Sequence, residues 1–264
     1  DLPQFKGRPG WEFTDISGLD LTAYEPVTGP EEATAEPLFA PAAATELPPG
    51  VIVAPIGDPE HAGLQGRYLG SLVSADDVFA ILNDGAEYRA GTFVYVPSNV
   101  VLEQPISIRT IQARAGTLLN HRTLIVIEPG AQAEVWEQYL SAAEDLDGVF
   151  NTVTELIVGE NAHLRYVCGQ DLSEQSWVFG SQRAEVGRDA ALDWVALGFG
   201  SKRGRVRMET RLAGQGADAR VTGAYATHGR QHIDFDTNQE HAAPNTTSDL
   251  AFRGVLQDRS TAVW

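Results

Sequence analysis

The chain has 264 residues, 43% of them hydrophobic, and its 19 basic and 36 acidic side chains give a net charge of −17. This hydrophobic content is enough to build a core, and the excess of acid argues against a nucleic-acid-binding protein, because phosphate neutralisation needs clustered Lys and Arg. No apolar run reaches the roughly 18 residues of a membrane span, and the single cysteine, Cys168, excludes an intrachain disulfide. We therefore expect a cytoplasmic protein that binds neither nucleic acid nor membrane.

Residues 1–90 are predicted to form a small N-terminal α/β segment that precedes the main body. Residues 25–50 are rich in Pro, Ala, Thr and Glu, a composition typical of an extended and poorly packed connector. A strand is predicted over 51–56. One short helix is predicted over 75–83, because Ser74 begins a capping box and an apolar stripe follows it.

Residues 91–264 are predicted to be mainly β. Short alternating or apolar runs are separated by turn residues, and no segment of useful length with a helical period interrupts them. The predicted strands are Thr92–Val96, Ile106–Ile111, Thr123–Ile127, Ala133–Tyr139, Thr152–Val158, Ala162–Cys168, Trp177–Val186, Ala191–Leu197, Arg205–Leu212 and Ala219–Ala226.

A repeat becomes visible when the turns between these strands are aligned. In each turn a Gly, Asn or Asp able to adopt positive φ is followed by Ala and then by an alternating strand. Successive turns are 31, 28 and 27 residues apart, so each unit is too small to bury its inner face alone and must stack on the next. A right-handed parallel β-helix is therefore predicted for 91–264, with a jelly roll or an ordinary β-sandwich as alternatives. The aligned turns are Gly130-Ala131, Asn161-Ala162, Asp189-Ala190 and Gly216-Ala217.

The densest polar cluster lies near the end of the chain. Strand alternation would place His232, Asp234 and Asp236 on one face. With His241 nearby, two imidazoles and a carboxylate would suit a metal ion, but the spacing matches no metal-binding motif. The preferred interpretation is that His232, Asp234 and His241 shape the last coils.

The other candidate residues are interpreted as structural. His121 and His163 are isolated in the sequence, and Cys168 lies in a strand, where a lone cysteine is more often a small buried hydrophobe than a nucleophile. The acidic residues within 144–147 indicate a solvated loop tip. Local motifs alone show no catalytic residue and no enzyme.

Several motifs occur in the order found in one protein family. They are Gly91–Pro97, Leu102–Ile106, Arg122–Val126, Leu164–Tyr166, and the tail His232, Asp234, Thr237, His241, Pro244–Asp249 and Gly254–Asp258, together with the amino-terminal Trp11–Asp15, which has the form Trp-x-x-Thr-Asp. With these motifs the chain resembles the SufB/SufD family, the scaffold subunits of the SUF iron–sulfur cluster assembly machine. The resemblance implies a right-handed β-helix flanked by helical segments, in agreement with the repeat.

Within this family the chain resembles SufD more than SufB. SufB-like chains carry a core cysteine, thought to receive persulfide sulfur, in a Gly-Cys-Ser-Ala segment, and the matching segment here is Tyr139–Ala142, with Leu140 in place of the cysteine. A SufB glutamate before Arg-Thr is replaced by His121. Of the remaining polar path only Gln170 and Arg183 are retained.

The resemblance implies a non-catalytic scaffold subunit. It would pair with a SufB-like subunit and be coupled to a SufC-like ATPase, although a homodimer is also compatible with the sequence. No cofactor is expected in the chain itself, and an iron–sulfur cluster would lie at the interface of the full complex. The family's Cys/His-containing segment and its terminal helices would lie beyond Trp264.

Two alternatives remain open at this point. The first is a β-helix polysaccharide lyase or hydrolase, in which Asp234 and Asp236 would bind calcium or act on sugars. The second is a SufB-like cluster scaffold in which Cys168 accepts sulfur.

Overall fold

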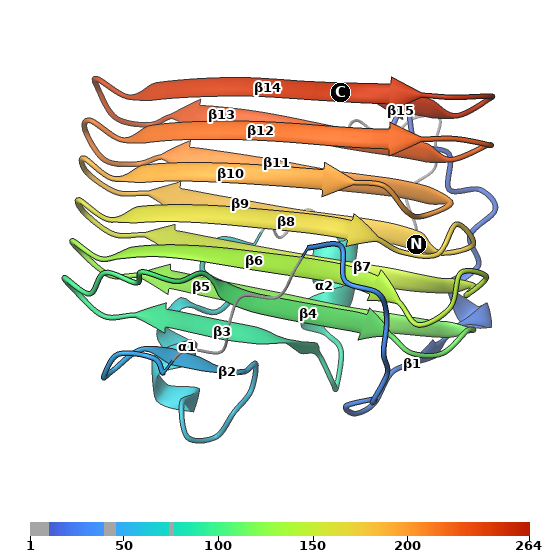
Figure 1. The fold of residues 1–264 in the computed structure, drawn as a ribbon, viewed down its shortest axis with the longest axis horizontal. Coiled ribbons are helices and arrows are strands. Elements are labelled where there is room, and N and C mark those ends of the chain that lie inside the picture. Colours follow the sequence, from blue (N-terminus) through green and yellow to red (C-terminus); the bar gives the residue numbers. More distant parts are fainter. Residues whose placement is uncertain (1–10, 40–45, 74–76) are drawn as a thin grey trace.

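The structure is a computed structural model that describes residues 11–39, 46–73 and 77–264. Its main body is a solenoid in which each coil contributes one strand to each of two sheets (Figure 1). The strands of the six-stranded sheet B run from left to right at the front of Figure 1, and those of sheet A return behind them while the chain climbs. This sense of winding is right-handed, so the predicted parallel β-helix is confirmed.

The strands of the two sheets alternate along the chain from the third strand onward. Neighbouring strands are parallel, except that β2 runs antiparallel to β3 and closes the lower end of sheet A. Sheet A contains β1 (Glu25–Pro26), β2 (Ile52–Pro55), β3 (Ala90–Val96), β5 (Thr117–Ile127), β7 (Gly148–Val158), β9 (Trp177–Val186), β11 (Arg203–Leu212), β13 (His232–His241) and β15 (Thr261–Val263). Sheet B contains β4 (Ile106–Gln112), β6 (Gln132–Ser141), β8 (His163–Asp171), β10 (Ala191–Gly198), β12 (Asp218–Thr227) and β14 (Thr247–Leu256).

The turn predicted from the repeat closes one end of each coil. Gly130, Asn161, Asp189 and Gly216 all have positive φ, between 52° and 74°. Each of these four residues donates its backbone N–H to a carbonyl of the next coil, so the turns form a hydrogen-bond ladder of their own. The alanine that follows each of them is at most 1% exposed. Close stacking of the turns therefore explains why the repeat combines a positive-φ residue with a small one.

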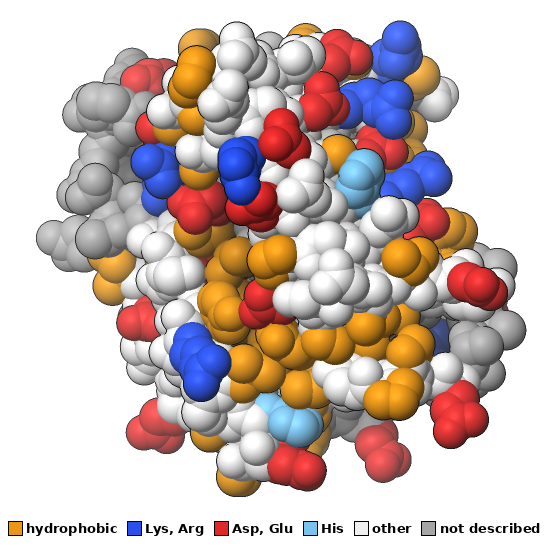
Figure 2. Space-filling view, turned by 90° about the vertical axis from the view of Figure 1, so that its left-hand side faces the viewer, with side chains coloured by type: hydrophobic (Ala, Val, Ile, Leu, Met, Phe, Trp, Pro, Cys, Tyr) orange, Lys and Arg blue, Asp and Glu red, His pale blue; other side chains and the backbone are white. Residues whose placement is uncertain are grey.

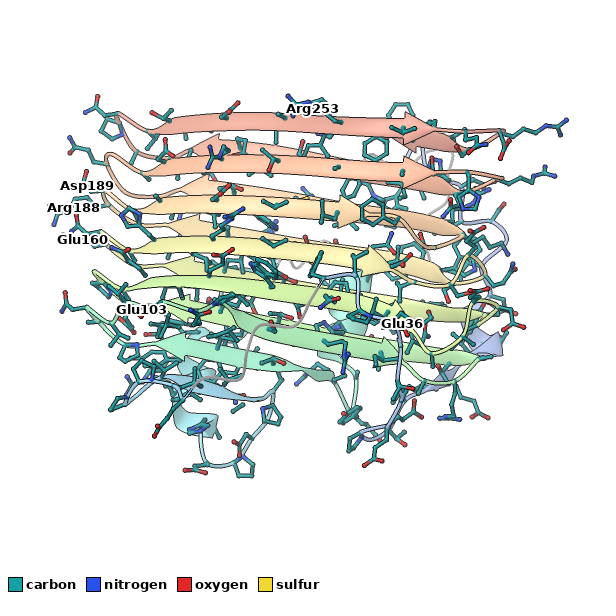
Figure 3. All side chains as sticks on the ribbon, in the orientation of Figure 1. Glu36, Glu103, Glu160, Arg188, Asp189 and Arg253 are labelled. Carbon is teal, nitrogen blue, oxygen red and sulfur yellow. The ribbon has the colours of Figure 1, made fainter. Side chains whose placement is uncertain are left out.

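Figure 2 views the molecule from the end at which these turns lie. Hydrophobic side chains gather over the middle and lower part of this end, and charged side chains occupy the upper part and the rim. The ion pair between Glu160 and Arg188 lies here, joining two successive turns (Figure 3).

Four strands of sheet A begin earlier than predicted, β5 and β7 by the largest margin, and three strands follow the last predicted one. Strand β5 begins at Thr117 and β7 at Gly148, several residues before the predicted starts. Both stretches contain polar residues, which the structure buries with hydrogen-bond partners. Asn151 Nδ2, for example, donates to Asn120 Oδ1 at 2.8 Å.

The predicted helix corresponds to α2 (Val78–Asp84), which begins three residues later than expected. Its N-cap is Asp77, whose carboxylate accepts the N–H groups of Phe79 and Ala80. The predicted cap, Ser74, lies outside the described residues.

The prediction of a single helix was wrong, because the structure has a second one, α1 (Ala62–Tyr68). Two glycines among its seven residues lower its helix propensity, which hid it in the sequence. Gln65 compensates by fixing the helix to the neighbouring chain, since its side chain donates to Pro55 O and accepts from Gly57 N. Neither helix approaches the length and apolarity that crossing a membrane requires, within the described residues.

Residues 27–39 of the predicted connector form no helix or strand, but the expectation of poor packing was wrong where Phe39 contacts sheet B. The backbone of Phe39 exchanges two hydrogen bonds with the side chain of Gln138, and its ring lies edge-on to that of Trp136 at a centroid distance of 5.9 Å. Gly169 makes room for this ring, because a Cβ at that position would lie 2.5 Å from it. The connector is thus anchored across the outer face of the sheet.

The inward faces of the two sheets enclose the lumen of the solenoid, which holds the main hydrophobic core. The outward face of sheet A is covered by α2 and by residues 11–24, which form a second cluster with Phe79, Trp177 and Phe179. These two surfaces, the lumen and the covered outer face, contain the buried polar groups considered next.

Candidate functional site

The lumen of the lower coils contains a buried cluster of polar side chains around Glu137. Thr123 Oγ1 donates to Glu137 Oε1 at 2.6 Å, and the Tyr166 hydroxyl donates to Oε2. His121 Nε2 lies 3.5 Å from Glu137 Oε1, and His121 Nδ1 lies 3.2 Å from Thr152 Oγ1. None of these five side chains is more than 1% exposed. The cluster is therefore isolated from solvent.

The register of the strands brings these groups together. His121 and Thr152 are directly paired on β5 and β7, and Glu137 is paired with Cys168 on β6 and β8. Alternation points all four side chains into the lumen, where the two sheets face each other. Residues far apart in the sequence thus share one interior space.

Burial favours the uncharged forms of both titratable groups at the centre. It raises the pKa of Glu137 above its usual range, although hydrogen bonds from Thr123 and other hydroxyls oppose the rise. It lowers the pKa of His121 to about 3. Thr152 donates its hydroxyl proton to the Tyr139 hydroxyl, so the Thr152 oxygen accepts a hydrogen bond from His121 Nδ1–H. The other ring nitrogen of the neutral imidazole, Nε2, then carries a lone pair that faces Glu137. A protonated Glu137 carboxyl group has an O–H that can donate a hydrogen bond to this lone pair.

Cys168 lies beside this cluster and is also buried. Its pKa is raised to about 12, first by burial and then by the carboxyl group of Glu137. A thiol that stays protonated is a poor nucleophile and a poor metal ligand. A cavity of about 30 Å³ adjoins it, which is room for a water molecule. The polar residues lining that cavity include Tyr139, Thr152, Gln170 and Gln182.

Two of the three weak metal candidates lie together on the outer face of sheet A. His232 Nε2 is 3.1 Å from Thr14 Oγ1, and this hydroxyl donates to Asp234 Oδ2 at 2.6 Å. His232 Nδ1 lies 2.8 Å from Thr261 Oγ1, so both ring nitrogens have partners. Burial lowers the pKa of His232, and the charge of Asp234 opposes this effect. The contacts are those of a structural hydrogen-bond network.

The third candidate, His241, is placed elsewhere. It ends β13, which His232 begins, so a strand of this length separates the two imidazoles by about 30 Å. His241 is exposed and contacts Thr246 Oγ1 at 2.7 Å and Ser248 Oγ at 3.0 Å. The three predicted residues therefore do not form one ligand set.

Leu140, which the resemblance aligns with the cysteine of SufB-like chains, lies outside the lumen. It is buried on β6 and lines a cleft of about 950 Å³ at the end of the solenoid opposite the repeated turns. The connector forms part of this cleft through Glu36 (Figure 3). Other acidic residues that line it are Glu144, Asp145, Asp171 and Glu174.

The remaining candidates of the polar path are separated by the sheet. Gln170 points into the lumen and donates to Gly200 O at 3.0 Å. Arg183 lies on the outer face of sheet A, where it pairs with Glu209 and donates to Leu72 O. The acidic residues of the 144–147 loop are exposed, as the sequence indicated. His163, which was interpreted as structural, is also exposed.

One group of possible cation ligands was missed by the sequence analysis. Asp58, Glu60 and His61 place one ligand atom each within 4.8 Å of one another in the turn before α1. Asp58 is already engaged within this turn, since Oδ1 accepts the Glu60 N–H and Oδ2 lies 4.0 Å from His61 Nε2. The group is therefore explained as a capped turn.

The lumenal cluster was also missed, although the sequence contained a signal for it. Val135, Glu137 and Tyr139 alternate on one predicted strand, so a lumenal Val135 implies that the other two residues also face inward. The sequence alone did not show which hydroxyl groups and which imidazole contact Glu137, because these contacts depend on how β5, β6, β7 and β8 are arranged.

Comparison with known proteins identifies the family of this chain. Residues 109–264, more than half of the chain, match the family model described as "SUF system FeS cluster assembly, SufBD core domain". The chain belongs to the SufBD core family. The resemblance noted in the sequence is thereby confirmed.

Relatives of this SufBD core are found among curated bacterial proteins. It is 29% identical over 209 residues to the "Iron-sulfur cluster assembly SufBD family protein" of Staphylococcus epidermidis, which covers 78% of this chain and 44% of that protein. It is 28% identical over 208 residues to the "Iron-sulfur cluster assembly protein SufD" of Bacillus subtilis, which covers 78% of this chain and 47% of that protein. The chain is thus homologous to SufD and spans less than half the length of these relatives.

Proposed function

We propose that this chain is the β-helix body of a SufD-like scaffold subunit, which takes part in iron–sulfur cluster assembly without itself carrying sulfur. Family membership and the names of the relatives support the assembly role. The observation that carries the second half of the proposal is the state of Cys168. It is buried, its pKa is raised to about 12, and Leu140 has no thiol.

The partners that we propose are a SufB-like subunit and a SufC-like ATPase, with the cluster as cargo at the interface of the full complex. The resemblance to the SufB/SufD family, whose members are scaffold subunits of one assembly machine, supports this choice of partners. The ATPase would act on the subunit pair from outside the β-helix.

The enzyme alternative, a polysaccharide lyase or hydrolase, has no observation in its favour. Its two carboxylates, Asp234 and Asp236, both accept hydrogen bonds from Arg205 at 2.7 Å. Carboxylates neutralised in this way are poorly suited to bind calcium or to protonate a sugar.

Co-expression of the complete protein with SufB-like and SufC-like subunits from the same organism tests the proposal. We expect the three proteins to elute together in size-exclusion chromatography. Separate elution of the unmodified subunits would refute the proposed partnership.

A further inference from the structure

The cleft that Leu140 lines is formed by loops at the end of the solenoid opposite the repeated turns. In Figure 1 this end is on the right, where the chain passes from sheet B to sheet A. Loops 142–147, 172–176 and 199–202 of three successive coils line the cleft. The connector adds Glu36 from the side of sheet B (Figure 3). The cleft is thus an open groove across several coils, and no strand of the ladders depends on what fills it.

Two buried serines fix the walls of the cleft. Ser173 Oγ donates to Glu144 O at 2.7 Å, and Ser176 Oγ donates to Leu146 O at 2.7 Å. These bonds tie loop 172–176 to the loop of the preceding coil. Both serines are at most 5% exposed, so water competes poorly for their partners. The cleft is therefore preformed, and a ligand does not have to order its walls on binding.

The floor of the cleft is apolar. Leu140 and Leu172 are buried at its base, and the half-buried Phe199 lies beside them. Ala142 and Ala226 line it as exposed residues. Covering this surface removes apolar area from water, which favours association. The aliphatic stems of Lys and Arg side chains can supply such cover while their charged ends stay at the rim.

The rim of the cleft carries carboxylates that lack Arg or Lys partners. Within the described residues the one basic side chain that lines the cleft is His228, whose Nε2 lies 2.8 Å from Glu174 Oε1. Burial raises the pKa of Asp171, and the negative charge of Glu174 adds to this rise. The other carboxylates of the rim form no ion pair with any Arg or Lys that the structure describes. They belong to Glu36, Glu144, Asp145 and Asp171.

Elsewhere the chain pairs its carboxylates with its own arginines. On the outer face of sheet B, Asp193 Oδ2 lies 3.5 Å from Arg165 Nε and 3.2 Å from Arg220 Nη2. On the outer face of sheet A, Arg205 Nη1 donates to Asp234 Oδ2 at 2.7 Å. The acids of the cleft have no such compensation, so their negative potential extends into the groove and attracts cations.

The spacing of the carboxylates shows which kind of cation fits. Among the described residues, three ligand atoms lie within 4.8 Å of one another only at Asp58, Glu60 and His61, outside the cleft. A divalent cation needs several oxygen ligands around one point, whereas separate ammonium or guanidinium groups can each pair with a different carboxylate. A second copy of the chain, with its net charge of −17, would bring like charges together. The cleft therefore suits a basic polypeptide.

We propose that this cleft is the docking site of a basic segment of a separate protein, whose Lys and Arg side chains lay their stems on the apolar floor and pair with the carboxylates of the rim. The site does not require the SufB-like or SufC-like partners proposed above. Its rim groups are Glu36, Glu144, Asp145, Asp171 and Glu174.

A fluorescein-labelled peptide of alternating lysine and leucine tests the site by fluorescence polarisation against the complete protein at physiological salt. We expect saturable binding to the wild-type protein. Binding should be at least about tenfold weaker to a variant in which the carboxylates of the two loops become amides, because each exposed ion pair contributes modestly and several are lost together. This cleft variant is Glu144→Gln/Asp145→Asn/Asp171→Asn/Glu174→Gln.

A charge-matched variant separates the cleft from the overall charge of the chain. It loses the same number of carboxylates from exposed residues that do not line the cleft. Binding to it should stay within about twofold of the wild-type protein, since distant exposed charges are screened by salt. This control variant is Glu12→Gln/Glu46→Gln/Glu87→Gln/Glu103→Gln.

Thiol protection locates the bound peptide without changing any carboxylate. Ala142→Cys places a thiol on the cleft, and Val101→Cys places one near the start of β6, at the opposite end of the solenoid. At a peptide concentration ten times its Kd, about one site in eleven is free, so alkylation of the first thiol should slow about tenfold. Alkylation of the second thiol should not change. Cys168 is buried and does not interfere.

Four results would overturn the proposal. They are no saturable binding of the peptide to the wild-type protein, an equal loss of binding in the cleft and control variants, an unprotected thiol in Ala142→Cys, and saturable binding of Mg²⁺ that the cleft variant loses. The last result, measured by isothermal titration calorimetry with Mg²⁺ alone, would assign the cleft to a metal ion. We expect no saturable heat from Mg²⁺.

Discussion

The lower and upper coils share one backbone ladder and one apolar core, but among the described residues only the lower coils also hold a buried carboxyl group and a buried imidazole in the lumen. The lower coils, β5 to β8, enclose His121, Glu137 and hydroxyl groups. The upper coils, β9 to β14, enclose apolar side chains such as Trp194 and Phe235. The change is visible along one row of sheet B, where Glu137, Cys168, Ala196 and Gly223 take the same lumenal position in successive coils.

This difference shows that the fold does not require a polar interior. Parallel pairing and the repeated turns are the same in both halves, so they are sufficient to stack the coils whatever the lumen contains. The carboxyl group and imidazole of the lower half are therefore an addition to the fold, stabilised only because each group has a partner and the pair is uncharged.

The largest expected effect is in the apolar half. Trp194 is fully buried in the upper lumen, and Trp194→Ala should lower the free energy of unfolding by about 3–5 kcal/mol because it opens a large cavity. Urea denaturation monitored by circular dichroism measures this loss. The half-buried Trp136 on the outer face is the matched control, and Trp136→Ala should cost less than half as much. Equal losses would contradict the picture of a tightly packed upper lumen.

A smaller loss is expected from breaking the polar half. Glu137→Leu leaves the hydroxyl groups of Thr123 and Tyr166 without their acceptor, and each unsatisfied buried group costs about 1–3 kcal/mol. Removing those hydroxyls as well, in Glu137→Leu/Thr123→Val/Tyr166→Phe, should restore most of the loss. A triple variant no more stable than the single one would mean that the lower lumen cannot accept the apolar filling of the upper half.

The pH dependence of unfolding should also distinguish the halves. The pKa of His121 is about 3 when folded and near 6.5 when exposed, so the unfolded chain binds more protons between these values and stability falls as the pH is lowered from 6.5 to 3. One such group contributes up to about 1.4 kcal/mol per pH unit. Glu137 acts in the opposite sense, since its folded pKa is raised above 4.5 and its stabilisation is lost as the pH rises through that raised value.

His121→Gln should therefore flatten the acid side of the stability profile, and Glu137→Gln should flatten the profile toward higher pH. Urea midpoints measured at intervals between pH 3 and pH 9 provide both slopes. Unchanged acid slopes in His121→Gln would show that His121 is not held neutral.

The smallest effect is expected on the outer face of sheet B. Arg165 lies between Glu134 and Asp193 in register, at 3.6 and 3.5 Å, and its side chain is 54% exposed. Arg165→Ala should lower the free energy of unfolding by no more than about 1 kcal/mol, and salt should reduce the difference. A loss above about 2 kcal/mol, measured as for the other variants, would contradict the expectation that these exposed ion pairs contribute little to stability.

The architecture could be predicted from the sequence because each coil repeats the same short turn motif. A positive-φ residue followed by alanine recurs at Gly130, Asn161, Asp189 and Gly216, and each occurrence reports the same stacked turn. The helix α1 could not be predicted, because its two glycines lower its helix propensity. Its stabilising contact, the hydrogen bond from Gly57 N–H to the Gln65 side chain, is a tertiary one.

The sites were harder to read than the fold. Alternation correctly placed His232 and Asp234 on one face, but their contact with Thr14 joins residues more than 200 positions apart. His121 looked isolated for the same reason, since its partners Thr152 and Glu137 come from other strands. Contacts of this kind depend on register and on the docking of the N-terminal segment, and neither is encoded in a local pattern.

The reactivity of Cys168 tests the central claim, that this β-helix is a scaffold body and not a sulfur carrier. The complete native protein is incubated with a cysteine desulfurase and cysteine, and persulfides are mapped by mass spectrometry, with Ala142→Cys as an exposed reference thiol. The account predicts labelling of the reference thiol, and of Cys168 only after unfolding in urea. Persulfide on Cys168 in the native protein would contradict it.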